Sequence, residues 1–152
     1  IQRREEPNTS GHSMVDGETT IRDRDKTSDN RSLVRAFVDD VLIARALEKL
    51  SEFVDEYAFT EHNPNRGDGL PSLSSALIER DANERLVIEY RQCHRVLAEG
   101  NFVLSVSEGA RDGAHTSFYD LFRIDNGKIV EHWDTIETIP PLSEWKNDNG
   151  KF

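Results

Sequence analysis

The chain has 152 residues, enough for one domain with a substantial core, and a formal net charge of −10 at pH 7. That charge argues against nucleic acid or an anionic membrane surface as a partner, and no apolar run suits a membrane span or a signal peptide. The single cysteine, Cys93, excludes an intrachain disulfide, and no Cys/His zinc spacing is present. We therefore expect a cytoplasmic protein.

Residues 1–29 differ in composition from the rest, with few large apolar side chains among many charges. Such a segment has little to bury, so we predict a flexible N-terminal arm lying on its own surface or on a neighbouring chain. The run Ser10-Gly11-His12-Ser13-Met14 resembles a cloning scar before a starting methionine. Residues 1–13 are therefore interpreted as vector-derived, which makes the arm of residues 1–29 partly vector-derived, and residues 30–152 are interpreted as a single domain.

Helical spacing of apolar residues begins at Asp29 and continues to Ala44, and a second short helix is predicted over residues 46–54. Residues 57–69 are predicted to form a loop, because Pro and Gly interrupt them. A third helix is predicted from Leu70 to about Arg80, with a proline near its first turn.

The hydrophobic period changes to that of β-strands after Asn83. We predict strands over residues 86–97 and 102–107, a turn at 98–101 and a loop at 108–113. A hairpin follows, so four antiparallel strands come after the helices. This order indicates an α+β fold in which one curved sheet packs against helices on its concave side.

The hairpin is predicted within residues 117–138, where two runs of β-branched and aromatic residues flank Asn126-Gly127. A two-residue turn would pair Asp120 with Trp133. A turn with the glycine in a left-handed bulge would instead pair Asp120 with His132. The second register is preferred because it gathers apolar side chains on one face.

One face of this hairpin then carries Phe118, Asp120, Phe122, Ile124, Val130, His132, Asp134 and Ile136. The other carries Tyr119, Leu121, Arg123, Ile129, Glu131, Trp133 and Thr135. The first face places two carboxylates and an imidazole among hydrocarbon. Such groups need partners or a function, so a structural hydrogen-bond pair and a catalytic site are both open.

Four segments carry a family resemblance: Tyr57–Pro64, His94–Val103, Asp120–Ile124 and Asn126–Asp134. Together they resemble the SnoaL-like polyketide cyclase family, within the nuclear-transport-factor-2-like (NTF2-like) superfamily. The resemblance implies a cone-shaped, strongly curved mixed or antiparallel sheet around about three N-terminal helices. It also implies a homodimer through the convex sheet face, and proton abstraction next to a carbonyl without metal or organic cofactor.

In the family an aspartate on the last hairpin is the base, and the resemblance implies this role for Asp134, with His132 and Asp120 as nearest partners. Burial would raise the pKa of such a carboxylate toward working pH. If Asp120 lies close by, one acid should keep its proton and could donate it to an enolate oxygen, as in ketosteroid isomerase. We therefore predict a cofactor-free acid/base enzyme for a small apolar carbonyl compound; the alternative is a non-catalytic protein that binds hydrophobic small molecules.

The predicted pocket is mostly apolar, with a volume of about 300–1,000 Å³ and the acids at its floor. Its predicted lining residues are His62, His94, Phe118, Phe122, Ile136, Phe37, Val41 and Tyr57. No local set of metal ligands such as His-x-Glu-x-His is present, so no metal is expected.

Overall fold

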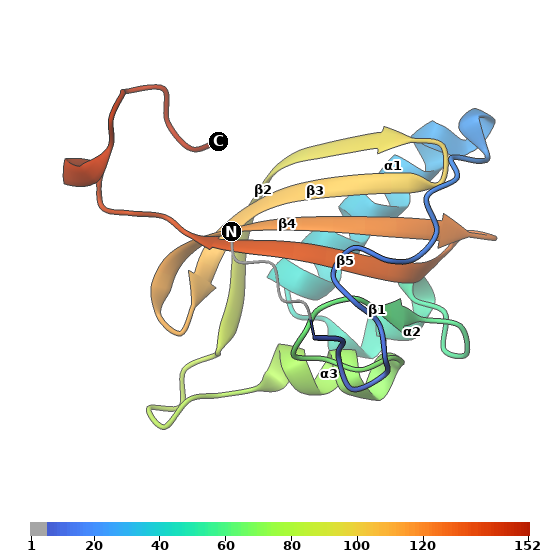
Figure 1. Cartoon of the computed structure of the whole chain (residues 1–152), viewed down its shortest axis with the longest axis horizontal. Coiled ribbons are helices and arrows are strands. Elements are labelled where there is room, and N and C mark those ends of the chain that lie inside the picture. The colour runs from blue at the N-terminus through green and yellow to red at the C-terminus, as the bar shows by residue number, and fades with distance from the viewer. Residues whose placement is uncertain (1–5) are drawn as a thin grey trace.

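Five strands form one open mixed sheet in the order β1-β5-β4-β3-β2 (Figure 1). In this computed structural model, which describes residues 6–152, the strands are β1 (Thr60–Glu61), β2 (Ile88–Glu99), β3 (Phe102–Arg111), β4 (Ala114–Asp125) and β5 (Lys128–Thr138). Strands β2 to β5 are antiparallel neighbours, whereas β1 runs parallel to β5. Residues 1–5 of the predicted arm lie outside the described residues.

The helices precede the long strands and cover one face of the sheet (Figure 1). Helix α1 (Thr27–Phe37) continues as a π-helical segment (Val38–Ile43), a 3₁₀ turn (Leu47–Lys49) leads into α2 (Leu50–Phe53), and α3 spans Leu70–Ile78. Short 3₁₀ turns also occur at Arg24–Lys26 and Leu142–Glu144. The α+β prediction is confirmed. No helix in residues 6–152 is long and apolar enough to cross a membrane.

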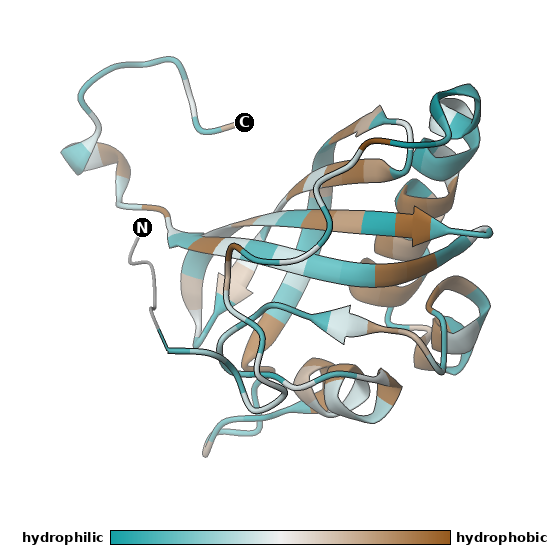
Figure 2. Ribbon diagram, turned by 45° about the vertical axis from the view of Figure 1, so that its right-hand side comes forward, coloured by the Kyte–Doolittle hydropathy of each residue, from teal (hydrophilic) through white to brown (hydrophobic). Residues whose placement is uncertain are grey.

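The core lies between the helices and the inner face of the sheet. Phe37 of α1 meets Phe122 of β4 edge to face, with ring centroids 5.6 Å apart, and Val34, Val41 and Phe118 are completely buried around them. Burial of each such side chain contributes about 1.5–3 kcal/mol. Hydrophobic and hydrophilic residues alternate along the strands, as half-buried strands require (Figure 2).

The β4–β5 register differs from both predicted registers. Asn126 (φ 47°) and Gly127 (φ 73°) form a two-residue turn with positive φ at both positions, which matches the twist of the flanking strands. Asp120 pairs with Asp134, and not with His132 or Trp133. Both predicted pairings of Asp120 are therefore wrong, because the extra residue of the bulge lies within β5 and not in the turn.

Most residues of β4 and β5 face the side of the sheet that was predicted for them, but the bulge turns one further residue inward. Ile124 pairs with Ile129, and the register then shifts by one residue so that Phe122 pairs with His132. Ile129 therefore joins the core, completely buried, although the outer face was predicted for it. Asp120, His132 and Asp134 share the inner face, as predicted.

Two predicted loops are partly strand. Residues 57–69 contain β1, where Glu61 pairs with His132 of β5. A two-residue edge strand has no hydrophobic period, so the sequence could not indicate it. Residues 108–113 were predicted to be a loop, but β3 extends to Arg111 and the turn is only Asp112-Gly113, both with positive φ.

The arm, from residue 6 on, lies across β5 and the outer face of the sheet of its own domain (Figure 1). Asn8 donates its side-chain amide to the carbonyl of Glu61 at 2.6 Å. Farther along, Arg22 and Asn101 exchange hydrogen bonds of 2.8 and 2.9 Å. The flexibility and the partly vector-derived origin of the arm stay predictions.

Candidate functional site

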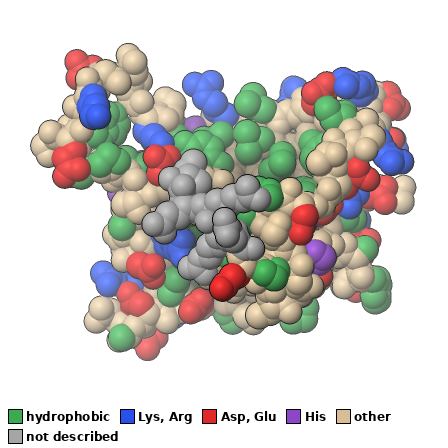
Figure 3. Space-filling view, viewed as in Figure 1, with side chains coloured by type: hydrophobic (Ala, Val, Ile, Leu, Met, Phe, Trp, Pro, Cys, Tyr) green, Lys and Arg blue, Asp and Glu red, His purple; other side chains and the backbone are tan. Residues whose placement is uncertain are grey.

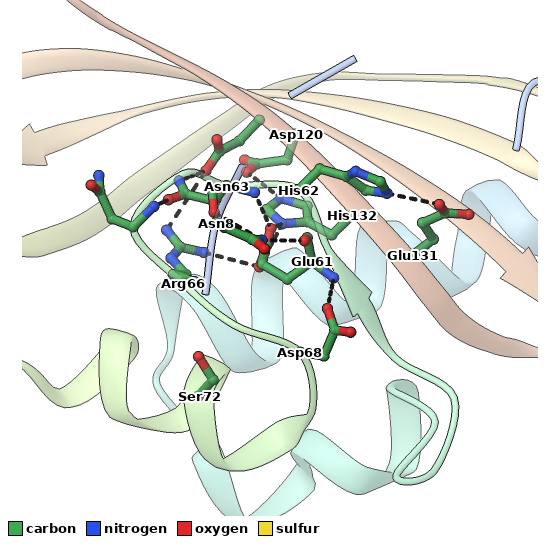
Figure 4. A network of polar contacts seen from close by, with 12 residues as sticks. Asn8, Glu61, His62, Asn63, Arg66, Asp68, Ser72, Asp120, Glu131 and His132 are labelled. Atoms are coloured by element: carbon green, nitrogen blue, oxygen red, sulfur yellow. Dashed lines mark hydrogen bonds and ion pairs between the residues drawn. The ribbon is translucent and has the colours of Figure 1, made fainter. Parts of the chain in front are cut away.

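His132 is at the centre of a buried polar cluster on the inner face of the sheet (Figure 4). Its Nδ1 lies 2.8 Å from Oε1 of Glu61, and its Nε2 lies 3.0 Å from Oδ1 of Asp120. Burial alone would lower the pKa of His132, but these two carboxylates raise it to about 10. His132 is therefore a buried cation that donates both of its N–H groups.

Glu61 reaches His132 because the parallel β1–β5 pairing places the two residues side by side. One of its carboxylate oxygens also accepts the backbone N–H of Asn63 at 2.9 Å, and the other lies 3.6 Å from the guanidinium of Arg66. Burial would raise the pKa of Glu61, but the charge of His132 and these other partners outweigh it and lower that pKa. Glu61 is thus an ionised partner at the floor of the cluster.

Asp120 accepts hydrogen bonds from two directions. His132 donates from β5, and the hydroxyl of Tyr90 in β2 donates at 3.1 Å. Burial raises the pKa of Tyr90 well above its usual value, so the phenol stays neutral and remains a donor. Asp120 therefore acts as a hydrogen-bond acceptor in both contacts.

Asp134 is held from the segment after β1. Asn63 donates its side-chain amide to Oδ2 of Asp134 at 2.6 Å, and the guanidinium of Arg66 lies 3.6 Å from the same oxygen. Burial raises the pKa of Asp134, and the charges of His132 and Arg66 oppose this shift only in part. Arg66 keeps its charge, because Asp134 and Glu61 raise its pKa despite its burial.

The charges of the cluster do not balance. Glu61, Asp120 and Asp134 are three carboxyl groups, whereas Arg66 and His132 are two cations. One negative charge is therefore in excess within a buried region, where it is costly. The raised pKa of Asp134 means that this carboxyl takes up a proton more readily than an ordinary aspartate does.

An interior cavity lies against this cluster, but it is small. Its volume is about 10 Å³, room for about one water molecule. Polar groups at one end are Arg66, Tyr90, Asp120 and His132; apolar walls are Phe37, Leu42, Val54, Phe59, Leu73, Leu77, Phe122 and Ile129. The prediction of a substrate-sized apolar pocket over the acids is wrong for this interior, because helix and strand side chains fill it.

Asp134 lines a second hollow, an open groove of about 210 Å³ on the surface. The groove is mostly polar, and its other lining residues are Met14, Asn63, Pro64, Asn65, Arg111 and Ile136. The acids therefore face two hollows: Asp120 and His132 border the cavity, while Asp134 borders the groove. Asp120, His132 and Asp134 nevertheless have donor atoms within 4.8 Å of one another.

Three residues predicted to line the pocket lie elsewhere. Tyr57 is 95% exposed, in the turn before β1. His94 lies on the outer face, 2.8 Å from Glu108 and stacked on Phe152, because the register of β2 shifts between Tyr90 and Gln92 and reverses the alternation of faces after Tyr90. His62 is buried, but its ring is on the outer face, next to Glu131.

The remaining predicted lining residues divide between core and site. Phe37 and Phe122 line the small cavity, and Ile136 lines the groove. Val41 and Phe118 are completely buried core residues that border neither hollow. Ordinary core positions and pocket walls have the same sequence pattern, so the two could not be separated in advance.

Sequence reasoning missed four members of the cluster: Glu61, Asn63, Arg66 and Tyr90. Three of them are in the segment predicted as a loop, where only the grouping of polar residues around His62 gave a signal. Tyr90 is on a predicted strand, but its partner Asp120 lies 30 residues away.

A metal ion at this cluster would compete with its hydrogen bonds. Asp120, His132 and Asp134 offer one donor atom each at suitable separation. However, both nitrogens of His132 are engaged by carboxylates, and an imidazolium has no lone pair to give. The donor set therefore fits a proton network better than a metal.

The fold of this chain is similar to that of several solved structures. A ketosteroid isomerase-like protein from Kribbella flavida is 16% identical over 84% of this chain and 93% of its own, with a TM-score of 0.64. An NTF2-like protein of unknown function from Burkholderia xenovorans is 16% identical (82% and 99%; TM-score 0.60). An epoxide hydrolase from M. tuberculosis, described as LEH-like, is 18% identical (74% and 85%; TM-score 0.53).

No family model matches the sequence, and no curated protein sequence does either. At these levels of identity the structural likeness establishes the fold alone. The chain therefore has the NTF2-like fold, which agrees with the wider superfamily named from the sequence.

Proposed function

We propose that this chain is a cofactor-free general acid/base enzyme of the isomerase type that acts on a small apolar carbonyl compound. The observation that carries the proposal is Asp134, a buried carboxyl with a raised pKa that borders an open groove. A general base works best when its pKa is close to working pH. A carboxylate in this state can remove a proton next to a carbonyl and return it elsewhere.

The substrate would lie in the groove with its apolar part against Met14, Pro64 and Ile136. Asn63 holds the Asp134 carboxyl in place through its 2.6 Å hydrogen bond. Negative charge that develops on the substrate oxygen would be stabilised by Arg111, which lines the groove together with Asp134.

Asp120 and His132 would support the reaction through charge and position. Both N–H groups of His132 are already donated, so it supplies positive charge in place of a proton. Asp120 fixes that cation from the other side. Proton donation by either residue, expected from the sequence, is therefore not part of this mechanism.

The structural neighbours favour this class without fixing the substrate. One is described as ketosteroid isomerase-like and another as an epoxide hydrolase, and both names denote chemistry on small organic molecules. Cyclisation of a polyketide, which the SnoaL-like motifs imply, is one reaction that begins with the proposed proton abstraction. An aldol-type condensation is another.

Deuterium exchange tests the proposal without knowledge of the product. A panel of small ketones is incubated with the protein in D₂O, and α-deuteration is followed by NMR. Wild type should accelerate the exchange of some compound, and Asp134→Asn should reduce that acceleration about 10²–10⁴-fold. Glu137→Gln, on the same strand but outside both hollows, is the matched control. Activity of Asp134→Asn within about threefold of wild type would end the proposal.

A binding protein without turnover is the second candidate, and a different hollow favours it. A space of about 480 Å³ lies between the arm and the outer face of the sheet, within the usual range for ligand pockets. Its lining is mostly apolar: Met14, Val15, Asp16, Glu18, Thr19, Ile21, Glu99, Phe102, Leu121 and Trp133. Mass spectrometry of small molecules released from the purified protein distinguishes a binding protein from an enzyme. A retained hydrophobic compound, together with no activity in the deuterium-exchange assay, would favour the binding protein.

A homodimer through the outer, convex face remains part of the proposal. Hydrophobic side chains gather on the sheet face turned away from α1 (Figure 3). Leu104, Tyr119 and Leu121 are among them and are only partly covered. An apolar surface of this kind suits a second copy of the chain.

A further inference from the structure

We propose that the hollow between the arm and the outer face of the sheet binds a hydrophobic organic cation, such as a quaternary ammonium compound. The hollow has a volume of about 480 Å³, and none of its lining residues within residues 6–152 belongs to the buried polar cluster. The inference therefore does not rest on the acid/base activity. It names a ligand class for the binding role that this hollow supports.

The arm forms the outer wall of the hollow where it crosses the sheet (Figure 1). At one end the indole N–H of Trp133 donates to the carbonyl of Asp16 at 2.8 Å, and a Cβ at Gly17 would lie only 2.7 Å from the indole. At the other end a Cβ at Gly100 would lie 2.1 Å from the carbonyl oxygen of Arg22. Both walls are thus fixed and come from one chain, so the site does not require the proposed dimer.

Two aromatic side chains line the sheet side of the hollow. Phe102 of β3 and Trp133 of β5 have ring centroids 6.2 Å apart and ring planes inclined at 41°. His62 stacks on one face of the indole, with ring centroids 4.6 Å apart, so a ligand would meet Trp133 from the other side. Aromatic rings attract a cation through their π-faces, and aromatic cages are the usual means of recognising quaternary ammonium groups.

The charged residues that line the hollow are all acidic: Asp16, Glu18 and Glu99. Asp16 is engaged by His62, whose Nδ1 lies 2.8 Å from its Oδ1. The backbone N–H of Thr20 donates to Glu18 at 2.8 Å and lowers the pKa of that carboxyl, which keeps it ionised. Glu18 and Glu99 are therefore the two carboxylates that a ligand can use.

The present partners of these two carboxylates are exposed arginines. Arg22 lies 4.0 Å from Glu18, and Arg24 forms an ion pair with Glu99. Both arginine side chains are 67% exposed, so solvent screens the pairs and little is lost when a ligand replaces them. The net charge of −10 also attracts cations and repels anions. The hollow thus fits an apolar body that carries one positive charge.

Fluorescence of Trp133 measures binding once the second tryptophan is removed. Trp145→Phe leaves Trp133 as the only tryptophan of the chain. In this background the probes are octyltrimethylammonium, octanol and octanoate, which have a similar hydrocarbon chain but different charge. At low ionic strength the cation should bind at least about 10-fold more tightly than the other two, and about 0.5 M salt should remove most of this preference.

Substitutions within the hollow separate the effect of charge from that of shape. Glu18→Gln and Glu99→Gln should each weaken binding of the cation about 3- to 10-fold and leave binding of octanol unchanged. Phe102→Leu keeps the lining apolar and should weaken binding of the cation about 2- to 5-fold. Glu144→Gln is the matched control, because Glu144 is an exposed acid outside the hollow.

Equal affinity for the three probes, no binding of any of them, or cation binding that Glu18→Gln and Glu99→Gln both leave unchanged would overturn the site. Cation binding that is lost in Asp134→Asn and kept in Glu99→Gln would place the cation in the groove and overturn it as well. Glu18→Gln should keep the full deuterium-exchange activity, so failure of this site and failure of the acid/base proposal are observed separately.

Discussion

Asp120 and Asp134 face each other across the β4–β5 ladder, yet their surroundings differ. Asp120 accepts hydrogen bonds from the His132 cation and from Tyr90, at 3.0 and 3.1 Å. Asp134 has the amide of Asn63 and a guanidinium at 3.6 Å, and burial raises its pKa. The two adjacent aspartates thus have different roles: Asp120 fixes the His132 cation, and Asp134 holds the excess negative charge of the cluster.

This difference predicts opposite effects of the same substitution on stability. Asp120→Asn removes one partner of a buried ion pair and should lower the free energy of unfolding by about 3–5 kcal/mol. Asp134→Asn removes the excess negative charge and keeps the shape, so it should leave that free energy unchanged or raise it. Urea denaturation at neutral pH measures both. Equal destabilisation by the two variants would contradict this account.

The pKa of His132 predicts how stability depends on pH. Its value of about 10 in the folded protein lies above that of an unfolded histidine, so the folded state binds the extra proton. The stabilisation is complete below about pH 6.5 and is lost as pH rises to about 10. The free energy of unfolding should therefore fall across this interval.

NMR titration of the imidazole resonances checks the assignment directly. The His132 signals, identified by their loss in His132→Gln, should stay constant from about pH 6 to 8. A midpoint near 6.5 would show that Glu61 and Asp120 do not hold the cation. The variant should also flatten the decline of unfolding free energy above neutral pH.

Much of the fold could be predicted because its signals are periodic. Helical spacing indicated the three helices, and β-branched runs indicated the four long strands. Asn126-Gly127 correctly indicated the last turn. The strand β1 and the bulge inside β5 could not be predicted, since each depends on contacts with a neighbouring strand and leaves no pattern of its own.

The candidate site could be predicted only along the hairpin. The preferred register placed Asp120, His132 and Asp134 on one face, and they share it because the bulge within β5 shifts the alternation by one residue, as the predicted bulge in the turn would have done. Glu61, Arg66 and Tyr90 come from other strands and loops, so their approach to His132 is a result of tertiary structure. The prediction of a large pocket was wrong for a similar reason: the free volume depends on how all the side chains pack, and here little remains.

Two glycines test the strand pairing that positions the cluster. At Gly109 in β3 a Cβ would lie 1.9 Å from the carbonyl oxygen of Glu89 in β2, so Gly109→Ala must separate the strands. We expect a loss of more than about 2 kcal/mol in the free energy of unfolding. Gly127 has open space and only a positive φ to accommodate, so Gly127→Ala should cost about 1–2 kcal/mol. Equal losses in urea denaturation would show that the close β2–β3 approach is not as described.

The proposed dimer is tested at the convex face. Leu121 lies in the middle of β4, on the outer side and only partly covered, so Leu121→Glu would place a charge within any interface formed there. Light scattering coupled to size-exclusion chromatography should give a dimer for wild type and a monomer for this variant. Ile78→Glu is the matched control, because Ile78 is 56% exposed at the end of α3, away from the sheet face. A wild-type monomer, or a dimer that Leu121→Glu leaves intact while Ile78→Glu disrupts it, would mean that copies of the chain do not associate through this face.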